Sequence, residues 1–81
     1  MEAEGRSFSR WSNAPGDVYA AHRHDYHKVI LVEEGSITFN LLEMDVSIQL
    51  EAGDRLQLPA HTLHAAVVGP RGVACLEAHI Q

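Results

Sequence analysis

The sequence predicts an all-β domain, either a sandwich or a barrel. Short apolar segments with alternating polarity follow one another at close spacing, and Gly or Pro stands in most of the intervals between them. No segment shows a sustained helical period. With 81 residues, the chain is expected to form one domain over residues 1–81.

Alternation and turn residues place the expected strands. We expect them at residues 7–11, 18–24, 28–33, 37–42, 46–50, 55–58, 62–68 and 73–80. The segment 28–33 is apolar on both faces, as is typical of a strand between two layers. The glycines in segments 33–36 and 69–72 predict tight turns that reverse the chain. In the last strand the expected buried face is apolar and consists of Ala74, Leu76, Ala78 and Ile80.

The composition excludes several classes of protein. A net charge of −5 argues against a nucleic-acid partner, which would require a clustered basic surface. No apolar run reaches the roughly 18 residues that span a bilayer, and the first residues lack the apolar core of a secretory signal. We therefore expect a cytoplasmic protein with no membrane partner. A single cysteine excludes an intrachain disulfide, so a metal or a second subunit is expected to stabilise the small core.

Five of the six histidines fall in two short segments, residues 22–27 and 61–64. His22 and His24 are two residues apart, so an extended chain points both imidazoles to the same side. A β scaffold can bring His64 to that pair. Three neutral histidines and one open position are the ligand set of many catalytic zinc sites. Imidazole ligands also suit nickel, copper and iron.

Two motifs make the sequence resemble a small single-domain cupin. The first is His-x-His followed by a strand and a glycine, from His22 to Gly35. The second is Gly-x5-Pro-x4-His, formed by Gly53, Pro59 and His64. The resemblance implies a jelly-roll β-barrel, also called a double-stranded β-helix. It further implies one divalent transition metal in the mouth of the barrel, either zinc, nickel, iron, manganese or copper.

The resemblance also implies that the three histidines of these motifs hold the metal together with an acidic residue. The sequence departs from the family at that fourth position, where Lys28 or Val29 stands in place of the usual glutamate. His27 lies beside it and is our candidate for the fourth ligand if the strand bulges there. The alternative is that strict alternation turns His27 to solvent.

Other polar residues are assigned ordinary positions. Lys28 shares the parity of the first two histidines, so it can reach into the barrel as an anion-binding group. We expect it instead to extend to the rim as a surface lysine. His61 is expected in a loop and His79 on the exposed side of the last strand. No suitably placed acid is apparent, since Glu33 and Glu34 belong to the predicted turn.

Two classes of function follow from this interpretation. The first is a metal-binding cupin of unknown substrate, with oxygenase and isomerase activities among those that the family includes. The second is a non-enzymatic module that binds or senses a small sugar-like or anionic molecule without metal. In both cases the partner is a small molecule. We also expect a homodimer, because a short chain leaves sheet edges open and residues 7–11 could pair with a neighbour's edge.

Overall fold

The computed structural model describes residues 6–80, with side chains from residue 9 onward. These residues form six strands and no helix, which confirms the all-β prediction. The strands are β1 (Arg6–Asn13), β2 (Val18–His22), β3 (His27–Leu41), β4 (Val46–Glu51), β5 (Arg55–Leu58) and β6 (His64–Ile80). Within this part of the chain, no helix is available that could cross a membrane.

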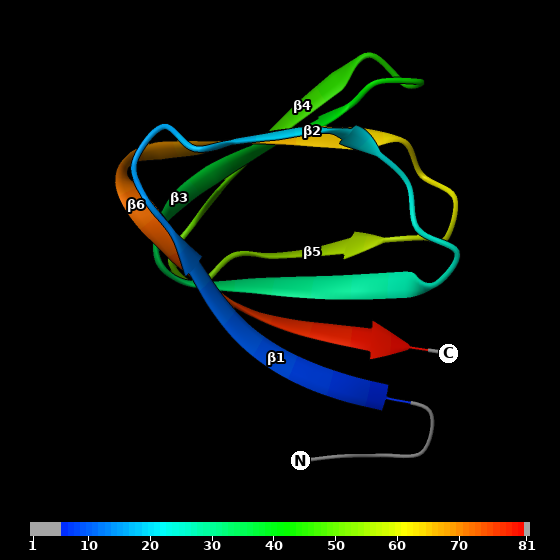
Figure 1. Cartoon of the computed structure of the whole chain (residues 1–81), viewed down its shortest axis with the longest axis horizontal. Coiled ribbons are helices and arrows are strands. Elements are labelled where there is room, and N and C mark those ends of the chain that lie inside the picture. Colours follow the sequence, from blue (N-terminus) through cyan, green and yellow to red (C-terminus); the bar gives the residue numbers. More distant parts are fainter. Residues whose placement is uncertain (1–5, 81) are drawn as a thin grey trace.

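The fold is organised around the two longest strands, β3 and β6. They pair antiparallel along most of their length, from His27 opposite Ile80 to Leu41 opposite His64. The beginning of β3 and the end of β6 form one layer, in which β5 pairs with β3 and β1 pairs with β6. Their other halves form the second layer with β4 and β2. Figure 1 shows both strands curving from one layer into the other.

The predicted reversals at segments 33–36 and 69–72 are wrong. The chain bends at both places but continues in the same strand, so each pair of expected strands is one long strand. The pairing of β3 with β6 has two irregularities between residues 32 and 37. Gly35 and Gly72 have φ angles of 77° and 78°, a region that glycine enters without steric cost. Bends at these neighbouring positions carry both strands into the second layer.

The hydrophobic core lies between the two layers. Along β3, every second side chain is buried on either side of the bend, as expected for a strand that faces the core with one side. The buried apolar residues are Ile30, Val32, Ile37, Phe39, Leu41, Leu50, Leu58, Ala66, Val68, Val73 and Cys75.

The end of β6 faces the opposite way from the prediction. Cys75 is fully buried, at 0% exposure, and alternation places Glu77 and His79 on the same inner side. The apolar residues expected to form the buried face are only partly buried and belong to the outer side of this layer. These residues are Ala74, Leu76, Ala78 and Ile80. Two polar side chains therefore enter the space between the layers.

Candidate metal centre

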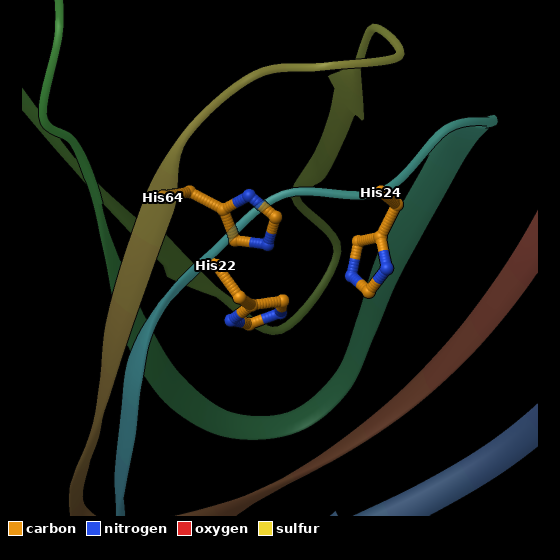
Figure 2. A group of neighbouring side chains, drawn as sticks. All are labelled: His22, His24 and His64. Atoms are coloured by element: carbon orange, nitrogen blue, oxygen red, sulfur yellow. The ribbon is translucent and has the colours of Figure 1, made fainter.

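Three histidines from the two sequence motifs meet at one end of the fold. His22 ends β2 and pairs directly with His64, the first residue of β6. His24 lies in the connection that follows β2. One nitrogen from each imidazole lies within 4.8 Å of the other two. Figure 2 shows the three rings directed toward a common space.

Backbone carbonyls fix the orientation of two of these rings. Nδ1 of His22 donates to the carbonyl oxygen of Ala20 at 2.7 Å, and Nδ1 of His64 donates to that of Thr62 at 2.9 Å. Because a carbonyl only accepts, each Nδ1 carries the proton and each Nε2 keeps its lone pair. The Nε2 of His64 is buried and has no hydrogen-bond partner. Leaving such an acceptor unsatisfied is costly, and a bound ion would remove that cost.

The third ring, that of His24, is held between Tyr26 and Lys28. Its Nδ1 lies 3.1 Å from the Tyr26 hydroxyl, and its Nε2 lies 3.4 Å from the Lys28 ammonium nitrogen. An ammonium group only donates, so Nε2 accepts from Lys28 and Nδ1 donates to Tyr26. The Tyr26 ring also stacks on the imidazole, with centroids 4.9 Å apart. These contacts fix both the plane and the tautomer of His24.

Burial favours the neutral form of two of the histidines. It is the main cause that lowers the pKa of His24, and the charge of Lys28 lowers that pKa further. Burial also lowers the pKa of His64, although the hydrogen bond to Thr62 acts in the opposite direction. The neutral imidazole is the form that binds metal ions.

A buried ion pair lies in the same pocket. The Lys28 ammonium is 3.7 Å from Oε1 of Glu77, and the two side chains are only 11% and 12% exposed. Oε1 of Glu77 also accepts from Nε1 of Trp11 at 2.9 Å, while Oε2 contacts Nε2 of His79. The expectation that Lys28 lies at the surface is therefore wrong. Glu77 was not expected in the pocket, although it lies two residues from Cys75, a residue type that is usually buried. The cluster of the three histidines does not include Glu77.

These groups surround a cavity of about 240 Å³. The three histidines form one part of its lining, and the pair Lys28–Glu77 forms another. The remaining walls are largely aromatic, with Trp11, Tyr19 and Phe39 among them. The cavity therefore combines nitrogen ligands, one cation and one carboxylate within an otherwise apolar wall.

The remaining histidines lie elsewhere. His27 is exposed and its Nδ1 accepts a hydrogen bond from the backbone nitrogen of Ala60 at 3.1 Å, so the structure does not bring it to the other three. His61 is an exposed loop residue with a φ of 68°. His79 was expected to be exposed, but its side chain is only 28% exposed and its ring stacks on Tyr26 with centroids 4.4 Å apart.

Several solved structures resemble the fold. A cupin-2 domain protein from Shewanella frigidimarina matches with a TM-score of 0.83 at 20% identity, over 100% of this chain and 76% of that one. An RmlC-like cupin from the same organism has a TM-score of 0.82 at 26% identity, with 94% and 66% covered. The polyketide cyclase RemF from Streptomyces resistomycificus has a TM-score of 0.85 at 22% identity. The match covers 96% of this chain but 56% of the cyclase.

The comparison by sequence agrees with the comparison by fold. No curated protein matches the chain. The family described as "Cupin domain" matches residues 9–74, a segment that begins in β1, contains all three clustered histidines and ends in β6. The chain therefore belongs to the cupin-domain family.

Proposed function

We propose that His22, His24 and His64 bind one divalent transition metal and leave a coordination position open to a small molecule. The main support is the cluster of three imidazoles, each with one nitrogen within 4.8 Å of the other two. In addition, Nε2 of His64 is buried without a hydrogen-bond partner. A metal bound there would act as a Lewis acid on the small molecule. Oxygenase and isomerase chemistry are both proposals for such a site.

The set of ligands favours some ions over others. Imidazole nitrogens suit zinc, copper, iron and nickel, whereas manganese favours oxygen ligands. The proposed ligands are all nitrogens, and two of them are oriented in advance by the carbonyls of Ala20 and Thr62. We therefore place zinc, nickel, copper and iron ahead of manganese.

Glu77 is the candidate for proton transfer in this site. Among the described residues that line the cavity, it is the one carboxylate. Trp11 and His79 contact its oxygens, so the carboxylate has a fixed position in the wall of the cavity that would receive a small molecule. A positioned carboxylate of this kind can accept a proton from a substrate.

A metal-free binding module is the second candidate. The Lys28 ammonium lies 3.4 Å from Nε2 of His24, one of the proposed ligand atoms. A cation at that distance repels a second cation. This contact favours a pocket in which the histidines and Lys28 together bind a small polar molecule.

Metal analysis of matched variants tests the proposal. We expect protein purified without chelator to contain about one equivalent of metal, and His64→Ala to contain much less. His27→Ala is the matched control, since His27 is exposed and lies outside the cluster. The His27→Ala protein should keep its metal. Its affinity for the metal should fall by less than about tenfold, the loss expected from disturbing a residue that only orients a ligand. Wild-type protein that takes up none of these ions would contradict the metal site, and the metal-free binding module would remain as the candidate function.

A cytoplasmic location stays a prediction. The single cysteine, Cys75, is buried and forms no disulfide within the chain, which is compatible with a reducing compartment. Fractionation of the native host cells would test it.

A further inference from the structure

Lys28 has fewer acceptors than its charge requires. Its side chain is 11% exposed, yet its nitrogen has one partner within hydrogen-bond distance, Nε2 of His24 at 3.4 Å. Glu77 stands farther away, at 3.7 Å, and its oxygens are already engaged by Trp11 and His79. An ammonium group has three donors, and buried lysines are normally paired. At least one donor of Lys28 is therefore free for a ligand in the cavity.

A metal at the three histidines would increase this deficit. The ion would take the lone pair of His24 Nε2 and thus remove the one close acceptor of Lys28. The charges in the cavity would then be that of the ion, one positive charge on Lys28 and one negative charge on Glu77. The sum is positive, so the loaded site would attract an anion.

We propose that Lys28 anchors the carboxylate of a small organic acid, whose other end faces the three histidines. This inference rests on the proposed metal site and defines the class of molecule that the site takes. Lys28 acts as a specificity-determining residue, because its charge distinguishes an acid from a neutral molecule of the same shape.

The size and lining of the cavity indicate how large the acid is and whether it has an apolar part. Its volume of about 240 Å³ lies below the roughly 300–1,000 Å³ of pockets for drug-sized ligands, so the cavity suits a small acid. Trp11, Tyr19 and Phe39 supply apolar surface next to the charged groups. Apolar walls favour a molecule with a carbon skeleton over inorganic phosphate, which would have to lose hydration along these walls.

The test compares two probes of the same shape on the metal-loaded protein. Lactate carries the carboxylate, and lactamide replaces it with a neutral amide. Titration calorimetry should show that lactate binds at least about tenfold more tightly than lactamide, the scale of one charge-assisted hydrogen bond. Lactate should also bind more tightly than phosphate. Equal affinity for lactate and lactamide would overturn the inference, and tighter binding of phosphate would overturn the organic acid as the ligand.

Two variants of Lys28 separate its charge from the charge of the metal. Lys28→Met should keep the metal and lose the preference for lactate, whereas Lys28→Arg should retain a preference. If the Lys28→Met protein contains metal and still prefers lactate, the metal alone accounts for the binding of the anion. That result would overturn the role of Lys28. If Lys28→Met does not fold, equal affinity of the wild type for lactate and lactamide still overturns the inference.

Elemental analysis of the same samples distinguishes this inference from the proposed function. Wild-type protein that binds metal but does not discriminate between lactate and lactamide would support the metal site and contradict the inference that the ligand is an organic acid. Wild-type protein that binds no metal but prefers lactate, with a preference that depends on Lys28, would support the anion site and contradict the proposed metal site. Each outcome therefore tells against one of the two proposals.

Discussion

Gly35 of β3 faces the carbonyl oxygen of Gly72 of β6 so closely that a Cβ atom at Gly35 would overlap it. The two glycines lie where the long strands pass from one layer to the other, and both have positive φ angles. The close approach of the backbones leaves room only for hydrogen at this position. The corner therefore depends on Gly35 for space as well as for conformation.

Replacement of Gly35 by alanine is expected to destabilise the protein strongly. The left-handed conformation alone disfavours alanine by about 1 kcal/mol, and the overlap with Gly72 adds about 1–3 kcal/mol. Gly53→Ala is the matched control, because Gly53 also has a positive φ but nothing within 4 Å of the added methyl group. Urea unfolding measures both variants. Equal losses in the two proteins would contradict the role of the close approach.

The stability of the metal-free protein should depend on pH through His24 and His64. Burial lowers the pKa of both groups below the ordinary value of 6.5, so the unfolded chain binds protons first as the pH falls. Stability should be full above about 6.5 and decrease below it, until the folded protein also takes up the protons. Urea unfolding of chelator-treated protein across this range measures the effect. His64→Gln should flatten the dependence, and an unchanged slope would contradict this assignment.

Removal of the buried carboxylate is expected to destabilise the folded state. Glu77→Gln keeps the shape and can still accept from Trp11, but it leaves Lys28 without its counter-ion. We expect a loss of about 1–3 kcal/mol in the free energy of unfolding. Glu33→Gln is the control, since it breaks an ion pair with Arg10 at the exposed surface and should leave the midpoint nearly unchanged. Comparable losses in both variants would contradict the distinction.

The thiol of Cys75 should be unreactive in the folded protein. The side chain is 0% exposed, and burial raises its pKa to about 11. A disulfide thiol reagent should therefore react only after denaturant is added. Ser12→Cys, which places a thiol on an exposed strand position, should react at once. Rapid labelling of Cys75 in the wild type would show that this part of the core opens readily.

The homodimer remains a prediction, and the structure offers a surface for it. On the outer side of the layer that contains β1, Val29 is paired with Ala78 and Leu31 with Leu76, so four apolar residues lie together. We expect two copies to pack through this face. Light scattering should give a dimer for the wild type and a monomer for Leu31→Glu, while Val67→Glu in the other layer should remain a dimer. A monomeric wild type at micromolar concentration would contradict the prediction.

The sequence predicted most strand segments but not how they connect. Segments 28–33 and 37–42 are both within β3, and the glycine between them suggested a reversal. A positive φ angle serves a hairpin and a bend equally well. What distinguishes them is the partner, since β6 bends beside β3 at the same level. The two bends lie in segments that are far apart in the sequence, so the local pattern around either glycine does not reveal their pairing.

The three histidines were also predictable, whereas the other half of the pocket was not. His22 and His24 share a side because of their spacing, and the family motif supplies His64. Lys28 and Glu77 were placed at the surface or left out, because charged residues on strands usually face solvent. Polar side chains that point inward break the usual pattern, and such breaks are most common at functional sites.

The sharing of β3 and β6 between the two layers has a consequence for unfolding. Neither layer contains a central strand of its own, because each central strand continues into the other layer. Separation of β3 from β6 breaks pairing in both layers, so these two strands should open together, whereas the strands at the edges, such as β1 and β4, can detach singly. Stabilisation by a ligand at the histidines should consequently slow hydrogen exchange along β3 and β6 in both layers. The two long strands thus carry the effect of binding from one layer to the other.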